Sequence, residues 1–501
     1  MLTYNKKRNM IKRILKTSLL FYLLLLPSMM VACSDSSDNN TGGEIPSIVD
    51  PVNVANQNIE RAMHLTDNTL SLYFDEDGMA MSRFYNPYKE TKSNEKGSVW
   101  MYTSSIEAVN AILSALTAHK ELGDAAYYDK NYARYTSTLD KLYGGLEYYM
   151  GTYSLTSYTQ TKSWSVYGVH RANSIGNANV SGIENVYDDQ MWLIRELLHS
   201  YKLTNKQEYL TKAEYLTEYV LDGWDTTIDE NGNENGGITW GPGYVTKHAC
   251  SNGPLVSSLV WLHDLYKGKN VDIEYRYIDS SDKQTRKSET RKKDQYYLDY
   301  AKKVYNWQKN LLMMSEGVYY DMRGGCDPNC DIVYETVGGV KYRKNTALTR
   351  SEGQAYSYNS GTMLSGSADL YRATNENVFL EDGKKLSDDA FNYFAKKGID
   401  VIGYYSYDTA GFNNWFNGIL MRGFVDMHSN YGKTKEYINT FQQNLDYAYT
   451  NYLYKGLLPT DLLKGWQASE KDNDGVEGMF NFSYAAEYAV LSEFQLVNKP
   501  K

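Results

Sequence analysis

A long helical pattern with very little proline constrains this sequence most. From about residue 54 to residue 496, apolar side chains recur at spacings of three and four residues, as in Ile106, Val109, Leu113 and Leu116. This is the spacing of one face of an α-helix. The 501 residues include only nine prolines, and proline is poorly tolerated inside helices. The chain is therefore predicted to be all-α.

The pattern predicts twelve helices. They lie at about residues 54–73, 100–122, 126–150, 188–203, 207–223, 247–267, 293–315, 352–373, 385–403, 413–430, 434–454 and 481–496. Strand-like segments are expected only in insertions, such as residues 331–336 and 340–343, which flank Gly338-Gly339 as the arms of a β-hairpin.

Twelve helices can form an open solenoid or a closed ring. A solenoid of repeats would show self-similarity at a fixed period, and the sequence has none. We therefore favour an (α/α)6 toroid of six antiparallel helix hairpins, with small β-hairpin insertions. The periodicity supports the all-α class and by itself leaves the closure of the ring open.

The N-terminus reads as a targeting segment. Six basic residues precede an apolar run that is too short for a comfortable membrane span and that ends in Met30-Val-Ala-Cys33. This ending resembles a bacterial lipobox; an ordinary secretory signal is the alternative. We predict a lipoprotein signal peptide at 1–32, lipidation of Cys33, a flexible tether at 33–52 and a catalytic domain at 53–501. The expected location is the outer membrane, anchored by lipid, either at the cell surface or facing the periplasm.

The charge balance argues against nucleic acid as a partner. The formal net charge is −9, and loss of residues 1–32 removes six basic and no acidic residues, which gives −15. Such a chain has no general attraction for a polyphosphate. The basic run at 283–293 is interleaved with polar residues and is interpreted as a solvated insertion. We expect a monomer.

Three cysteines remain after the leader. Cys326 and Cys330 are close enough in sequence to close a small disulfide loop, and Cys250 would stay unpaired. No second pair of cysteines or histidines stands nearby, so we predict no metal site.

Two adjacent carboxylates, Asp188 and Asp189, stand where an apolar helical run begins. Aspartate is common in the first turn of a helix, where it caps backbone N–H groups. A capping box would also need Glu or Gln three residues on, where Met191 and Trp192 stand instead. Two neighbouring carboxyls repel each other and their pKa values separate, and glycoside cleavage needs one ionised and one protonated carboxyl.

Aromatic and amide residues gather at the starts of several predicted helices. Aromatic rings offer apolar faces to the C–H faces of sugars, while amides and arginine bond hydroxyl groups. Core packing is the better explanation of any one of them taken alone, so their repetition is the observation that counts. The candidate substrate-binding residues are Trp100, Tyr187, Trp240, Asn252, Tyr358, Asn359, Phe416 and Arg422.

These residues resemble glycoside hydrolase family 76, the endo-α-1,6-mannanases. The matching blocks span roughly residues 57–494 and come in the family's order: 186–192, 236–240, 247–254, 356–361 and 416–422. The segment Lys247-His-Ala-Cys250 and the insertions near 268–294 and 323–346 depart from the family's pattern. The resemblance implies an (α/α)6 fold and a retaining mechanism without cofactor on α-mannan. It makes Asp188 the nucleophile and Asp189 the general acid/base.

Two other classes of protein stay open at this point. A surface glycan-binding lipoprotein without activity would share the tether and the aromatic residues, and only the aspartate pair with its matching blocks separates it from an enzyme. Another (α/α)6 sugar hydrolase or lyase is the second alternative. Enzymes that act on uronates usually carry a basic cluster, which this sequence lacks.

Overall fold

A computed structural model describes residues 50–500. The predicted signal peptide, Cys33 and nearly all of the tether lie outside the described residues. Within residues 50–500 the chain is mostly helical, with thirteen α-helices and short antiparallel strand pairs. This confirms the predicted fold class.

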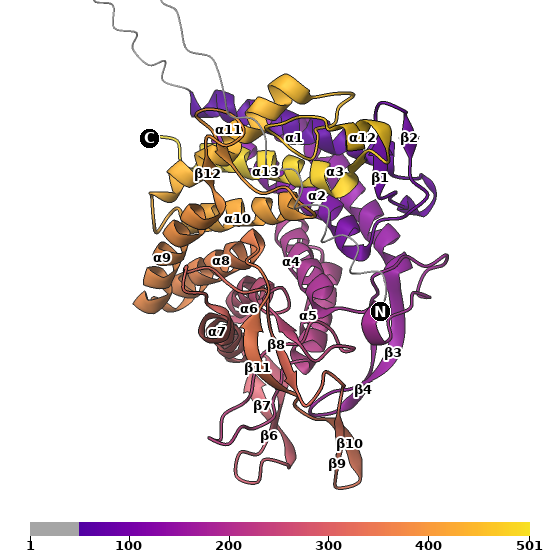
Figure 1. Cartoon of the computed structure of the whole chain (residues 1–501), viewed down its shortest axis with the longest axis vertical. Coiled ribbons are helices and arrows are strands. Elements are labelled where there is room, and N and C mark those ends of the chain that lie inside the picture. Colours follow the sequence, from indigo (N-terminus) through magenta and orange to yellow (C-terminus); the bar gives the residue numbers. More distant parts are fainter. Residues whose placement is uncertain (1–49, 501) are drawn as a thin grey trace, which may run out of the picture. The chain divides into compact units, whose positions relative to one another are not determined.

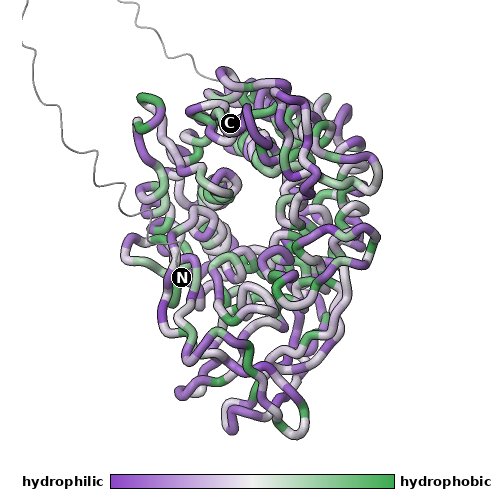
Figure 2. Tube along the Cα trace, turned by 45° about the vertical axis from the view of Figure 1, so that its right-hand side comes forward, coloured by the Kyte–Doolittle hydropathy of each residue, from purple (hydrophilic) through white to green (hydrophobic). Residues whose placement is uncertain are grey.

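Six helices form an inner ring. They are α2 (Val99–Leu122), α4 (Tyr187–Thr204), α6 (Gly253–Tyr266), α8 (Ser357–Thr374), α10 (Asn413–Met427) and α13 (Gly478–Val497). Each packs against the next in this order, and α13 packs against α2, so that the ring is closed. Figure 2 shows the Cα trace closing around a central axis.

Six helices cover the outside of this ring (Figure 1). They are α1 (Pro51–Tyr73), α3 (Ala125–Leu146), α5 (Gln207–Asp222), α7 (Lys293–Leu312), α9 (Asn377–Phe394) and α11 (Thr434–Tyr452). A further short helix, α12 (Ala468–Asp472), lies in the connection before α13 and was not expected from the sequence.

Burial explains why the two sets of helices differ in sequence. The inner helix α2 is buried on nearly every side, because an outer helix covers one face and other inner helices cover the rest. The outer helix α3 buries a single stripe that includes Tyr135, Leu139 and Leu142. An outer helix therefore has the amphipathic period of a surface helix. An inner helix buries residues on nearly every side, polar ones among them.

The strands lie in the connections. Three hairpins are β3–β4 (Met150–Thr156, Thr161–Tyr167), β6–β7 (Asp272–Ile278, Arg286–Lys292) and β9–β10 (Tyr334–Val337, Val340–Arg343). A three-stranded sheet joins β5 (Lys247–His248), β8 (Met322–Asp327) and β11 (Ala347–Glu352). The smaller pairings are β1 (Phe84–Asn86) with β2 (Thr91–Lys92) and β14 (Val476–Glu477), and β12 (Lys396–Lys397) with β13 (Tyr405–Ser406).

Several details of these connections test the sequence predictions. The hairpin around Gly338-Gly339 is confirmed as β9–β10. The basic run forms the mostly exposed strand β7, as a solvated insertion should. Cys326 and Cys330 form a disulfide, and Cys250 is a buried free thiol.

Some predicted helix boundaries were wrong. Helix α6 begins at Gly253 rather than 247, because residues 247–248 pair with β8. Helix α8 begins at Ser357 rather than 352, because residues up to 352 belong to β11. Helix α3 ends at Leu146, and residue 150 starts β3.

The largest error concerns α9, which covers Asn377–Phe394 rather than 385–403. Gly383 lies inside it and weakens the helical signal. That glycine allows close packing, since a Cβ there would lie 2.7 Å from the end of the Met427 side chain. None of the helices within residues 50–500 combines the length and the apolarity that a bilayer span requires.

Candidate active site

Asp188 and Asp189 lie in the first turn of α4. The N-terminus of this helix has no side-chain cap; the backbone N–H of Tyr187 instead donates to the carbonyl of Trp240 at 2.7 Å. Gln190 fixes the other side, because its amide donates to the carbonyl of Tyr167 at 2.7 Å and accepts the backbone N–H of the same residue at 3.2 Å. The turn that carries the carboxylates is therefore held by strand β4 and by the loop before β5.

The two carboxyl groups differ in environment. Asp188 keeps some open surface, and its oxygens accept the backbone N–H of Asp189 at 2.8 Å and the indole N–H of Trp240 at 3.3 Å. Burial among protein atoms, with a smaller contribution from the charge of Asp321, raises the pKa of Asp188 to about 6 despite these hydrogen bonds.

Asp189 is 8% exposed. Burial first, and then the negative charge of Asp188, raise the pKa of Asp189 well above its ordinary value. The positive end of the helix dipole favours both anions, but the loss of hydration dominates. The pair thus has one carboxyl with hydrogen bonds that favour its anion, and a second carboxyl that retains its proton more readily.

Trp240 forms one side of the site. Its ring packs against Tyr244 with centroids 4.7 Å apart and stacks on His248 at 5.0 Å and 27°. Both Trp240 and Tyr244 keep open surface. Burial lowers the pKa of His248 to about 4, so this imidazole is neutral at pH 7.

Asp321 is a third carboxylate at the site, and the sequence analysis missed it. Its Oδ2 lies 3.8 Å from Nδ1 of His248, and burial raises the pKa of Asp321 to about 6. Asp321 precedes β8, whose Met322 pairs with His248 of β5. No local sequence signal joins these residues, because strand pairing brings them together across more than seventy positions.

An aromatic cluster lies at the starts of the neighbouring inner helices. Tyr358 of α8 packs on Phe416 of α10 with centroids 4.2 Å apart, and Phe416 stacks on Trp100 of α2 at 6.0 Å and 21°. Cys250 connects this cluster with the carboxylates, because its thiol neighbours both Asp188 and Tyr358. The structure therefore brings together six of the predicted residues: Asp188, Asp189, Trp240, Tyr358, Phe416 and Trp100.

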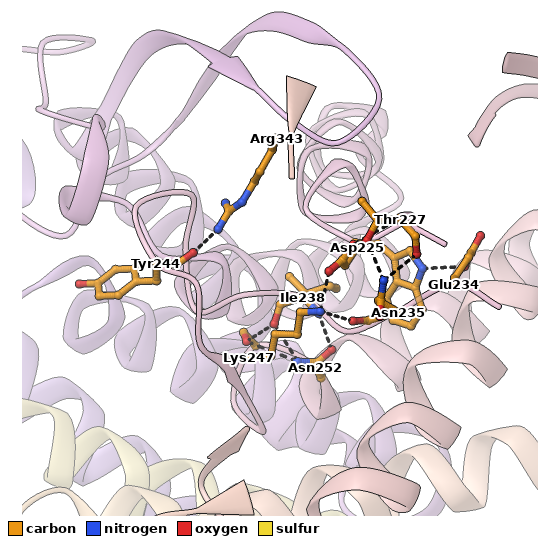
Figure 3. A network of polar contacts seen from close by, with 12 residues as sticks. Asp225, Thr227, Glu234, Asn235, Ile238, Tyr244, Lys247, Asn252 and Arg343 are labelled. Atoms are coloured by element: carbon orange, nitrogen blue, oxygen red, sulfur yellow. Dashed lines mark hydrogen bonds and ion pairs between the residues drawn. The ribbon is translucent and has the colours of Figure 1, made fainter. Parts of the chain in front are cut away.

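A buried polar network holds the loop that carries Trp240 (Figure 3). The ammonium of Lys247 donates to Asp225 Oδ2 at 2.8 Å and to the carbonyl of Gly236 at 2.6 Å. Asn252 accepts the backbone N–H of Ile238 at 2.9 Å and donates to the carbonyl of the same residue at 3.0 Å. These bonds secure both ends of the loop.

The β9–β10 insertion supports the same loop. Arg343 is buried and donates to the backbone carbonyl of Pro242. It also donates to the backbone carbonyl of Tyr244 (Figure 3). Gly241 allows this loop to lie against the residues just before α4, since a Cβ there would come within 2.4 Å of the carbonyl of Asn185. One of the segments that departs from the family's pattern thus shapes the surroundings of the carboxylates.

Besides Tyr358, which is 7% exposed, four predicted substrate-binding residues have little or no open surface. Tyr187 is 1% exposed and packs against Tyr219 in the core. Asn252 and Asn359 are fully buried, and the amide of Asn252 is bonded to backbone. Arg422 is buried well inside α10, where it pairs with Glu107. Each of these four residues was predicted from a motif near a helix start, but its side chain is buried in the protein.

A closed helical ring that presents two adjacent carboxyls beside aromatic rings has the features of a glycoside hydrolase. The chain belongs to glycosyl hydrolase family 76: the model of that family, described as Glycosyl hydrolase family 76, matches residues 142–267 and 288–499.

The chain is also similar to individual proteins. It is 27% identical over 174 residues to the mannan endo-1,6-alpha-mannosidase DCW1 of Candida glabrata, a match that covers 34% of this chain and 29% of that protein. Among solved structures, the family 76 mannosidase Bt3792 of Bacteroides thetaiotaomicron has a TM-score of 0.63 at 19% identity, over 88% of this chain and all of that one. The GH76A alpha-1,6-mannanase of Salegentibacter sp. HEL1_6 has a TM-score of 0.55 at 21% identity, over 87% and 99%.

Proposed function

We propose that this chain is a retaining endo-α-1,6-mannanase that cleaves the backbone of α-mannan with Asp188 and Asp189 and without a cofactor. The observation that carries the proposal is the unequal pair of carboxyls in the first turn of α4. The choice of substrate is supported by relatives that are described as α-1,6-mannanases, one of which is known as an inactive variant, with two consecutive aspartates replaced, in complex with α-1,6-mannotriose.

Asp188 is assigned as the nucleophile. Its two oxygens accept N–H groups from Trp240 and from the backbone of Asp189, and such bonds favour the anion. The carboxylate attacks the anomeric carbon, and the bond from that carbon to the glycosidic oxygen breaks, which leaves a glycosyl ester on Asp188.

Asp189 is assigned as the general acid and base. It retains its proton because burial and the neighbouring charge of Asp188 both favour the neutral form. The proton passes to the departing glycosidic oxygen. Asp189, now ionised, then removes a proton from water, which attacks the ester and releases the sugar with its original anomeric configuration.

We further propose that lipidation of Cys33 anchors the protein in the outer membrane, where the monomer faces polysaccharide at the cell surface. The proposal is supported by the lipobox-like sequence before Cys33 and by the polar tether that follows it.

Reducing ends released from unbranched α-1,6-mannan test the proposed activity. The mature chain should release them in increasing number, while Asp188→Asn and Asp189→Asn should each lose at least about 1000-fold in kcat. The matched control is Asp129→Asn, a carboxylate on the exposed face of α3, which should retain full activity. A wild-type chain that binds mannan and releases nothing would be a binding protein instead.

A further inference from the structure

A cavity of about 410 Å3 lies inside the ring, apart from the candidate active site. All six inner helices contribute to its wall, and on α2, α4, α8 and α10 the contributing residues lie further along the helix than the site residues. On α4 they include Arg195, His199 and Lys202. With a rise of 1.5 Å per residue, Lys202 lies roughly 20 Å beyond Asp189 along the helix axis. The cavity therefore belongs to the opposite end of the ring.

Trp415 separates the two sites. Its ring packs against Trp100 with centroids 5.2 Å apart and against Tyr358 at 6.4 Å, both on the side of the carboxylates. Its N–H donates to Glu107 of the cavity wall at 2.8 Å, and its other neighbour, Trp192, lines the cavity. Because Trp415 is only 2% exposed, it fills the space between them.

Three charged groups of the wall are already in ion pairs, and Glu493 accepts a hydrogen bond from Ser114. Glu107 pairs with Arg422, and Arg195 pairs with the neighbouring buried Glu196. Ions that are already paired at close range have little net field left for a charged ligand. The wall also has an apolar part, which consists of Trp192, Ile419, Val490 and Phe494.

Lys202 and Asp426 lie on this wall without an ion pair to any of the described residues. The ammonium of Lys202 lies 3.7 Å from the centroid of the Trp261 ring. Both side chains are accessible, yet burial among protein atoms lowers the pKa of Lys202 to about 8 and raises that of Asp426 to about 6. Both groups line the cavity, and the hydrogen-bonding capacity that they do not use within the protein is available to a ligand.

We propose that this cavity is a second sugar-binding site, which takes a neutral mono- or disaccharide between Lys202 and Asp426. Hydroxyl groups both donate and accept, so that a single sugar can satisfy an ammonium and a carboxylate together, and its C–H faces suit the apolar part of the wall. The volume is within the range of about 300–1,000 Å3 that is usual for small-molecule sites. The inference goes beyond the proposed function, because a chain that failed to cleave mannan would keep this cavity.

Calorimetric titration of the Asp188→Asn/Asp189→Asn chain with α-1,6-mannobiose tests the proposal, since turnover is then blocked. Two binding events are expected. Trp240→Ala should weaken binding at the active site at least about tenfold and leave binding in the cavity unchanged. The near-isosteric double variant Lys202→Met/Asp426→Leu keeps the net charge. It should weaken binding in the cavity and leave binding at the active site unchanged.

A second variant tests the cavity independently, in case the Lys202→Met/Asp426→Leu chain does not fold. Ser429 lines the cavity and is exposed, so that Ser429→Trp narrows its opening without a change in the core. Ser429→Trp should likewise weaken sugar binding in the cavity. A single binding event that neither cavity change affects would overturn the proposal, and so would tighter binding of inorganic phosphate than of sugar in the cavity. If the wild-type chain does not cleave mannan but sugar still binds in the cavity, the proposed function is refuted and this proposal stands.

Discussion

Trp240 donates its indole N–H to Oδ2 of Asp188 at 3.3 Å, while Oδ1 of the same carboxyl accepts the backbone N–H of Asp189. Both bonds stabilise the anion of Asp188. They oppose the effect of burial, which is the main reason that its pKa is raised to about 6. The residue that forms one aromatic side of the site therefore also adjusts the charge of the proposed nucleophile.

Trp240→Phe should move the acid limb of the pH–rate profile upward. The cleavage step needs ionised Asp188 and protonated Asp189, so kcat/KM should fall below about pH 6 and again at higher pH, with apparent pKa values that belong to the pair. Phe keeps a ring beside His248 and removes the N–H, and one long hydrogen bond corresponds to a shift of about 0.5–1 pH unit.

The profile of kcat/KM on a mannooligosaccharide measures this shift. Tyr244→Phe is the control, because it keeps the ring that packs on Trp240 and removes no donor to Asp188. An unchanged acid limb in Trp240→Phe, together with a raised KM, would make Trp240 a sugar platform alone.

Asp189→Asn should stabilise the protein at pH 7. The folded pKa of Asp189 is raised, so the folded state holds its proton more tightly than the unfolded chain does. Below the unfolded pKa of about 3.9 the carboxyl is protonated in both states and does not affect stability. As pH rises from there toward the folded pKa, the unfolded chain ionises first, and the free energy of unfolding falls. An amide removes this loss. Urea unfolding at pH 4 and pH 7 should show a gain for the variant that is larger at pH 7, and an equal effect at both values would contradict the burial argument.

Asn252→Ala should destabilise the fold by about 1–3 kcal/mol, because it leaves the buried backbone N–H of Ile238 without its partner. Chemical denaturation measures the loss. The folded fraction should keep its KM, since Asn252 is fully buried. Asn177→Ala, in an exposed loop, is the control. A raised KM with unchanged stability would return Asn252 to the substrate-binding set.

Local periodicity was sufficient for the all-α class, and adjacency in the sequence was sufficient to place Asp188 and Asp189 at one helix start. The closure of the ring depends on contacts between distant helices, and only the resemblance to the family implied it. The sequence was not sufficient for Asp321 and His248, which meet only through the pairing of β5 with β8. It also could not tell that Arg422 points inward, since a motif at a helix start does not specify which face its last residue occupies.

Cys33→Ala should move the protein from the membrane fraction to the soluble fraction. The described residues contain no helix suited to a bilayer span, and acyl chains on Cys33 would supply the missing membrane affinity. Fractionation of cells that express either form, with immunoblotting, measures the change. Ser34→Ala, which leaves the lipobox-like residues intact, should stay with the membranes. Equal membrane partitioning of Cys33→Ala would refute lipidation at this residue.

The roles of the two carboxyls can be separated with azide and an activated aryl α-mannoside, whose leaving group needs no proton. In Asp189→Ala, Asp188 should still form the glycosyl ester, and azide should then attack it to give the α-mannosyl azide after two inversions. In Asp188→Ala no ester forms, so that azide can only attack the substrate directly and give the β-mannosyl azide. The assignment rests on the unequal surroundings of the pair, with N–H donors on Asp188 and a raised pKa for Asp189. Proton NMR of the two products distinguishes the anomers. An α-product from Asp188→Ala and a β-product from Asp189→Ala would reverse the assignment.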